Sequence, residues 1–112
     1  MRQFEIVVDE PAEVGGTDEG PQPTELFLAS LASCFAMSVA HVARKRGIEL
    51  ADLSVVADGE YDGPRFARLR LVVRSSHPRP ALDEIARRAV SYCYISNTLA
   101  HRPAVEVRIG EE

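Results

Sequence analysis

The chain has 112 residues, of which 46% are hydrophobic and 27% are charged. This length supports one hydrophobic core, so we expect a single domain over residues 1–112, and the composition is that of a folded protein. The formal net charge of −4 supplies no overall positive field for nucleic acid, which is therefore not an expected partner. Two cysteines are too few for a disulfide-stapled secreted scaffold, and the first nine residues contain too short an apolar run for a signal peptide. Together these features favour the reducing cytoplasm.

The first 22 residues predict a strand followed by a loop. Over residues 3–9, apolar side chains alternate with mostly polar ones, which indicates a strand. The apolar face of this strand consists of Phe4, Ile6 and Val8. Residues 10–22 are rich in glycine and proline, which indicates a loop.

A long helix is predicted next. Pro23 suits a first helical position, and Glu25 suits a first turn, where a carboxylate favours the positive end of the helix dipole. The basic residues 44–46 and then Gly47 mark its end. Between Leu26 and Ala43 only His41 can carry a charge. Because this helix is apolar nearly all round, we expect it to be buried nearly all round.

Two environments could bury such a helix. Its length, about 18 uncharged residues, is the lower limit for crossing a bilayer, but polar side chains interrupt it, so we expect no membrane partner. These side chains are Ser30, Ser33, Ser38 and His41. One chain of this size has too few elements to cover the helix, so we predict a homodimer with two such helices packed inside. The small residues at 29 and 33, and at 30 and 34, would let the helices approach closely.

The second half of the chain predicts a hairpin, two helices and a strand. Residues 52–61 and 66–74 indicate the hairpin strands, and apolar spacing indicates a helix over residues 82–90. Residues 93–99 indicate a further helix, and alternation over 105–109 indicates a last strand. The order β-α-β-β-α-α-β predicts an α+β fold.

The second hairpin strand is expected to have one apolar and one basic face. Its inward residues would be Ala67, Leu69, Leu71 and Val73, and its outward residues Arg68, Arg70 and Arg74. Cross-strand pairing with acidic residues explains the basic face more simply than an anionic ligand does.

Cys34, midway along the long helix, and Cys93, near the start of a predicted helix, are the residues best suited to chemistry. Free cysteines often serve only as small buried hydrophobes. Alternatively, one thiolate could attack the O–O bond of a peroxide and become a sulfenic acid, which a second thiol would convert to a disulfide. That chemistry needs the two Cα atoms within about 7 Å in the fold. A helix N-terminus at Cys93 would favour its thiolate.

Two segments carry a family resemblance. The residues from Gly16 to Phe35, GTDEGPQPTELFLASLASCF, and from Tyr92 to Leu99, YCYISNTL, resemble the OsmC/Ohr family of osmotically inducible proteins and organic hydroperoxide reductases. The resemblance implies a long central helix wrapped by β-sheet in an intertwined homodimer, with two sites at the subunit interface. It implies that Cys34 is the peroxidatic cysteine and Cys93 the resolving one. It also implies an organic hydroperoxide substrate and a dithiol reductant such as a dihydrolipoyl group, with no metal, haem or other cofactor.

The chain departs from the family pattern at the residues around each cysteine. Peroxidase members have an acidic residue directly after the helix-starting proline, which holds an arginine against the thiolate. Here Thr24 follows Pro23, and Glu25 comes one position later, about 100° around the helix. Glu25 remains a catalytic candidate beside its simpler role at the helix dipole. No arginine lies within residues 3–43, and Tyr94 stands where the family usually has proline.

Four apolar or aromatic residues are candidates to bind a hydrophobic substrate: Phe27, Leu31, Phe35 and Tyr94. His41 lies seven residues after Cys34, about 10.5 Å along the helix axis, which is too far for one metal ion to bridge them. The histidines and cysteines show no metal-ligand spacing. Two alternatives to a peroxidase remain open: a non-catalytic stress or small-ligand-binding protein, and a thiol redox sensor.

Overall fold

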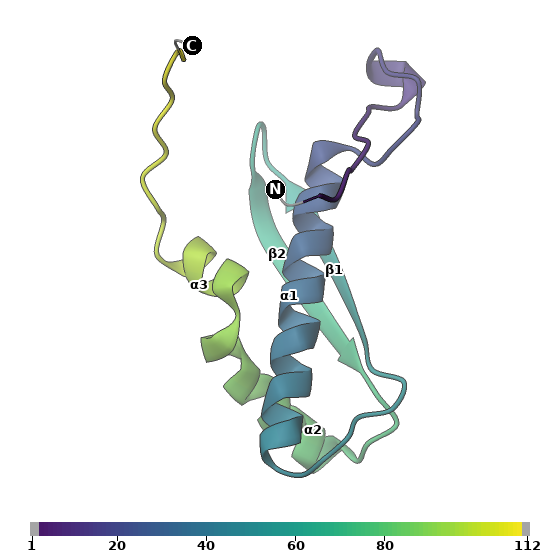
Figure 1. Ribbon diagram of the computed structural model, residues 1–112, viewed down its shortest axis with the longest axis vertical. Coiled ribbons are helices and arrows are strands. Elements are labelled where there is room, and N and C mark those ends of the chain that lie inside the picture. The colour runs from purple at the N-terminus through teal and green to yellow at the C-terminus, as the bar shows by residue number, and fades with distance from the viewer. Residues whose placement is uncertain (1–2, 111–112) are drawn as a thin grey trace.

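The structure, a computed structural model, describes residues 3–110 (Figure 1). It is an α+β fold, as predicted, with three α-helices and one antiparallel hairpin. In chain order the elements are η1 (Ala12–Val14), α1 (Pro23–Lys45), β1 (Ser54–Tyr61), β2 (Phe66–Arg74), α2 (Arg79–Ala89), η2 (Val90–Tyr92) and α3 (Tyr94–Ala100). The hairpin and α2 pack on α1, and α3 runs back beside it.

Helix α1 begins and ends where its sequence signals predict. Gln22 precedes it, and the Glu25 carboxylate accepts the backbone N–H of Gln22 at 2.8 Å, while the Gln22 side chain accepts the N–H of Glu25. This reciprocal capping satisfies two backbone donors that the first helical turn leaves without partners. At the other end, Gly47 takes a left-handed conformation with φ of 73°, which glycine adopts without the steric cost of a Cβ atom.

Only one face of α1 is buried within the single chain, and the burial of its other faces by a second copy stays a prediction. Leu31, Phe35 and Val39 point into the core, whereas Met37 is 73% exposed and Ser33 is also exposed. The physical reason is the number of elements, because the hairpin and α2 are too few to surround a 23-residue helix. By length and composition α1 could also cross a membrane, and a third of its most apolar window is buried inside the fold.

The hairpin pairs charged residues across its two strands. Asp58 lies opposite Arg70, and Glu60 lies opposite Arg68, so the acidic partners come from β1. Such cross-strand pairs of opposite charge stabilise a sheet face. The register shifts between Glu60 and Tyr61, which leaves Ala67 without a partner on β1. Ala67 is therefore exposed, contrary to the prediction that it faces inward.

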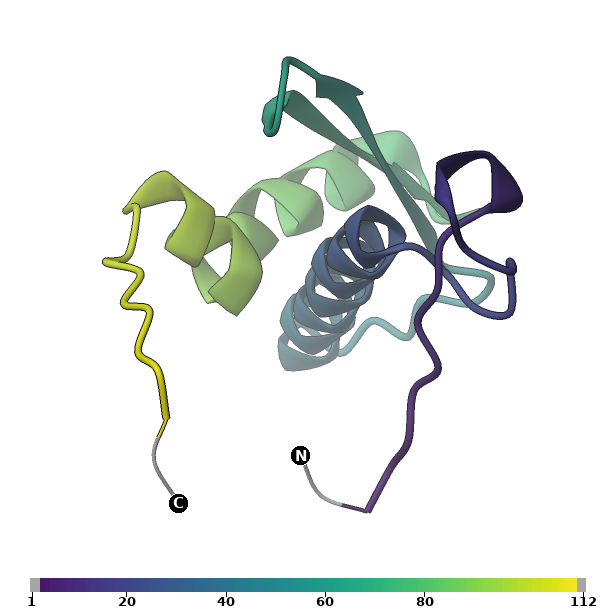
Figure 2. The same ribbon diagram turned by 90° about the horizontal axis from the view of Figure 1, so that it is seen from above.

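The two predicted terminal strands are not formed in the single chain. Residues 3–9 and 103–110 contain no regular element, and most of their apolar side chains face solvent. Val105, Val107 and Ile109 are 86%, 85% and 92% exposed. A strand requires a ladder of backbone hydrogen bonds to a neighbouring strand. Asp9 N–H donates to the Pro21 carbonyl at 3.1 Å, but within residues 3–110 neither segment pairs with β1 or β2. Figure 2 shows both segments extending past α1 on opposite sides of it, away from the hairpin.

The shape of the chain reflects these extended segments. Its radius of gyration is 17.0 Å, whereas a compact domain of this length has a value of about 13 Å. The compact part is built on a small core between α1, α2 and the segment that leads into α3. The core consists of Phe35, Val39, Val42, Ala43, Ile85, Ala89 and Cys93. One of the two cysteines is thus a core residue.

Candidate functional site: a thiol pair beside an open pocket

The fold brings the two cysteines together, although 59 positions separate them in the sequence. Cys34 lies on α1, half-buried, and packs against the core cluster that contains Cys93. Cys93 is fully buried, at 0% exposure, in the residue that precedes α3. Both are free thiols. Helix α3 packs along α1, and this packing holds Cys93 against the middle of α1.

The surroundings of Cys93 favour its thiolate. Burial by itself raises the pKa of Cys93, but hydrogen bonding from the Ser96 side chain, from the Ser96 N–H, from the Cys34 thiol and from the Ile95 N–H outweighs burial and lowers that pKa. These donors stabilise the charged sulfur, and Cys34 packs against the core cluster to which Cys93 belongs.

Cys34, and not Cys93, faces an accessible pocket. This pocket, which we call the thiol pocket, has a volume of about 280 Å³. It is lined by Cys34, Met37, Ser38, His41, Tyr92 and Tyr94. The His41 and Tyr92 rings meet edge to face, with centroids 5.2 Å apart. A small apolar molecule entering this pocket therefore reaches the Cys34 sulfur before it reaches Cys93.

The four predicted substrate-binding residues do not line one pocket. Tyr94 lines the thiol pocket, as a substrate contact should. Leu31 and Phe35 are 2% and 5% exposed, and their side chains pack into the protein interior because they lie on the buried face of α1. Phe27 lies one turn before Leu31 and lines a different pocket.

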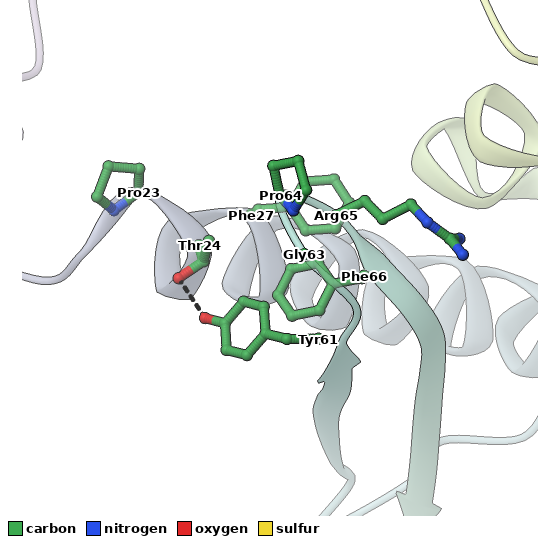
Figure 3. A pocket seen from close by; sticks show the side chains of 8 residues that line it. All are labelled: Pro23, Thr24, Phe27, Tyr61, Gly63, Pro64, Arg65 and Phe66. Carbon is green, nitrogen blue, oxygen red and sulfur yellow. Dashed lines mark hydrogen bonds between the residues drawn. The ribbon is translucent and has the colours of Figure 1, made fainter.

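That second pocket lies where the hairpin turn meets the start of α1 (Figure 3). It has a volume of about 380 Å³ and is mostly apolar. The Phe66 ring stacks on Phe27 at 5.7 Å and on Tyr61 at 4.8 Å, and the Tyr61 hydroxyl donates to Thr24 Oγ1 at 2.9 Å. Neither cysteine lines this pocket, so within the single chain it is separate from the thiol pair.

Glu25 is placed at the helix start and not beside the cysteine of its own chain. Nine residues separate it from Cys34 on α1, which corresponds to about 13 Å along the axis. Its carboxylate accepts the Gln22 N–H. The geometry thus agrees with the capping alternative for Glu25, and the catalytic alternative would require a second chain.

A pair of substitutions at Glu25 distinguishes capping from catalysis. Glu25→Ala is expected to lower the free energy of unfolding by about 0.5–2 kcal/mol because it removes the capping acceptor. Glu25→Gln keeps an acceptor and should cost far less. Neither change should alter the rate at which a hydroperoxide oxidises the thiols, measured by intact mass alongside chemical denaturation. Slower oxidation in Glu25→Gln at unchanged stability would instead assign Glu25 to the reaction.

Four lining residues lie outside the site that the sequence predicts: Met37, Ser38, His41 and Tyr92. The sequence contained a usable signal, since positions 34, 37, 38 and 41 follow the i, i+3, i+4, i+7 spacing of one helix face. Tyr92 could not be placed, because its position depends on how η2 packs against α1. Within residues 3–110, no group of three or more histidine, cysteine, aspartate or glutamate side chains could hold a metal ion.

These features place the chain among α+β proteins that carry two neighbouring free cysteines, one half-buried and one buried, beside an open apolar pocket. The sequence model of the OsmC-like protein family matches residues 16–108. The organic hydroperoxide resistance protein OhrB of Bacillus subtilis (strain 168) is 31% identical over 112 residues, covering 95% of this chain and 79% of OhrB. The chain therefore belongs to the OsmC-like protein family.

Solved structures support the same fold. The crystal structure of Bacillus subtilis OhrB matches with a TM-score of 0.63 and 29% identity, covering 88% of this chain and 74% of that chain. An OsmC-like protein from Mycoplasma pneumoniae matches with a TM-score of 0.71 and 21% identity, covering 90% of this chain and 76% of that chain. The family resemblance of the two cysteine-containing segments is thus confirmed.

Proposed function

We propose that this protein is a thiol-dependent peroxidase that reduces organic hydroperoxides with Cys34 and Cys93. The observation that carries the proposal is the contrast between the two thiols: Cys34 lines an open pocket, and the buried Cys93 belongs to the core cluster against which Cys34 packs. A peroxide must reach the first thiol, and a resolving thiol must contact the first without competing for the peroxide. The relationship to OhrB supports an organic hydroperoxide as the substrate.

The proposed reaction balances without a metal or cofactor. The Cys34 thiol passes its proton to the Cys93 sulfur and attacks the distal peroxide oxygen, so the O–O bond breaks and Cys34 becomes a sulfenic acid. The departing alkoxide takes the proton from Cys93 and leaves as the alcohol. The Cys93 thiolate then attacks the Cys34 sulfur and releases hydroxide, which forms a disulfide. A dithiol of the dihydrolipoyl type would reduce that disulfide and become oxidised itself.

We further propose that the working form is a homodimer in the cytoplasm. The exposed face of α1, which includes Met37, and the two extended terminal segments present exposed apolar side chains. Both segments project on the side of α1 that the hairpin leaves open (Figure 2). A second copy could cover this face and supply neighbours for the segments. It could also bring a cation from the partner to Cys34.

Intact mass tests the peroxidase proposal. One equivalent of an organic hydroperoxide such as cumene hydroperoxide should remove two hydrogen atoms from the reduced protein, and a dihydrolipoyl reductant should restore them through many cycles. If both thiols stay reduced in excess hydroperoxide, the proposal is wrong and a ligand-binding role is the better account. The apolar pocket at the hairpin turn favours that second candidate. Disulfide formation without catalytic turnover would indicate a redox sensor.

A further inference from the structure

Ser38 places a hydroxyl group in the buried part of α1. It is 6% exposed, and it is the one polar side chain among the buried residues that the structure describes. Serine forms helices less well than alanine, and a hydroxyl group is costly to bury unless it makes hydrogen bonds. Neither helix formation nor packing therefore explains why this position carries a hydroxyl group.

The Ser38 hydroxyl uses its hydrogen within the helix. Ser38 Oγ donates to the backbone carbonyl of Cys34, one turn earlier, at 3.0 Å. A hydroxyl oxygen can also accept two hydrogen bonds, and no donor within residues 3–110 supplies one to Ser38 Oγ. The oxygen atom therefore keeps its capacity to accept a hydrogen bond.

Ser38 and the reactive Cys34 line the same pocket, the thiol pocket. Residues four positions apart on a helix have Cβ atoms about 5–6 Å apart, and a hydrogen bond between two oxygen atoms spans about 2.5–3.0 Å. A single oxygen atom in contact with the Cys34 sulfur can therefore also donate its hydrogen to Ser38 Oγ.

Ser38 lies outside the face of α1 that the proposed homodimer would cover. One residue turns an α-helix by about 100°, so Ser38 points away from its neighbour Met37, which is 73% exposed. Val42, one turn after Ser38 on the same side of the helix, is 4% exposed and belongs to the core cluster. A second copy on the Met37 face therefore leaves the Ser38 hydroxyl in the thiol pocket.

We propose that Ser38 is a catalytic residue that holds the distal oxygen of the hydroperoxide by accepting its hydrogen. This inference rests on the proposed peroxidase function and adds a residue to it. As the Cys34 sulfur attacks, the S–O bond forms and the O–O bond breaks, so the sulfur is oxidised and the departing alkoxide takes the proton from Cys93. The transferred oxygen keeps its own hydrogen, which remains donated to Ser38 Oγ in the sulfenic acid.

Removing the hydroxyl group tests this contact. Ser38→Ala should lower the second-order rate constant for oxidation of Cys34 by cumene hydroperoxide about fivefold, the size of one hydrogen bond. Alanine is the stronger helix former, and it leaves no buried polar group behind, so the variant should remain folded. Oxidation of Ser38→Ala at the rate of the unmodified protein, followed by intact mass, would overturn the proposal.

A second reagent separates contact with the peroxide from an effect on the sulfur itself. Methyl methanethiosulfonate also reacts with a cysteine thiolate, but it has no hydrogen-bond donor. Its rate of reaction with Cys34, assigned by peptide mapping, should therefore be the same in Ser38→Ala and in the unmodified protein. Equal losses of rate with both reagents would mean that Ser38 acts on the Cys34 thiolate, and would contradict the proposal.

Ser33 supplies the matched control variant. Its hydroxyl also donates to a backbone carbonyl one turn earlier, that of Ser30 at 3.2 Å, but Ser33 is exposed and does not line the thiol pocket. Ser33→Ala should leave the rate of oxidation unchanged. A loss equal to that of Ser38→Ala would indicate a general effect of serine on α1 and contradict the assignment.

The unmodified protein separates this inference from the peroxidase proposal. If cumene hydroperoxide leaves its Cys34 reduced, the peroxidase function fails and the role of Ser38 fails with it. If Cys34 is oxidised and Ser38→Ala reacts equally fast, the peroxidase function stands and only the role of Ser38 is wrong.

Discussion

Replacing Cys34 by serine is expected to lower the rate of hydroperoxide reduction by about 10³-fold or more, because the attacking sulfur is lost. Replacing Cys93 by serine is expected to leave the first oxidation in place and stop the second. The Cys93→Ser protein should therefore gain one oxygen atom on Cys34 after one equivalent of hydroperoxide, where the unmodified protein loses two hydrogen atoms. Intact mass and peptide mapping distinguish the two results.

The buried position of Cys93 explains why the two substitutions should differ. Cys93 is fully buried, whereas Cys34 lines the thiol pocket, so a peroxide has no comparable route to Cys93. Oxygen addition at Cys93 in the Cys34→Ser protein, at the rate seen for Cys34, would reverse the assignment. Neither variant can form the Cys34–Cys93 disulfide within one chain, which makes each variant an internal control for the other.

A pair of substitutions at position 34, Cys34→Ser and Cys34→Ala, tests the interaction between the two thiols. Serine at 34 keeps a hydroxyl donor for the Cys93 thiolate, and alanine does not. Since hydrogen bonding from Cys34 contributes to lowering the pKa of Cys93, Cys34→Ala should raise that pKa relative to Cys34→Ser. The pH at which Cys93 is half-ionised, followed by the ultraviolet absorbance of the thiolate, should then be higher in the alanine variant. The same midpoint in both would rule out the interaction.

Acidic substitutions in the C-terminal segment are expected to dissociate the proposed homodimer. Val107 and Ile109 are 85% and 92% exposed in the single chain, so Val107→Asp with Ile109→Asp should cost the isolated subunit little. If a second copy buries these side chains, two unpaired carboxylates must be desolvated, at a cost of several kcal/mol. The dimer dissociation constant should therefore rise about 100-fold or more, as measured by sedimentation velocity across protein concentration.

The opposite face of the same segment supplies the control. Glu106 and Arg108 pair with each other at 2.6 Å and are exposed, so Glu106→Gln with Arg108→Gln should leave the association unchanged. An unmodified protein that sediments as a monomer at micromolar concentration would contradict the dimer proposal. A dimer that tolerates both acidic substitutions would show that residues 105–109 lie outside the interface.

Local signals in the sequence were sufficient for α1, the hairpin and the two later helices. Proline and a capping carboxylate mark the start of α1, glycine marks its end, and period-two alternation marks β1 and β2. These features act between residues that are close in sequence, so the amino-acid sequence alone is enough to recognise them. The terminal strands were predicted by the same alternation and are absent from the single chain, because a strand also needs a neighbour that the pattern cannot specify.

The same distinction between local signals and tertiary packing applies to the candidate site. The two cysteine-containing segments by themselves determined the family and the two thiols, since these depend on residue types at fixed spacing. The α+β class followed from the order of the predicted helices and strands. Only the tertiary structure decided that Cys93 is buried while Cys34 faces a pocket, that Phe35 belongs to the core, and that Tyr92 lines the thiol pocket. The physical reason is that exposure and contact depend on how α2, η2 and α3 pack against α1, and helix packing joins residues that no sequence spacing relates.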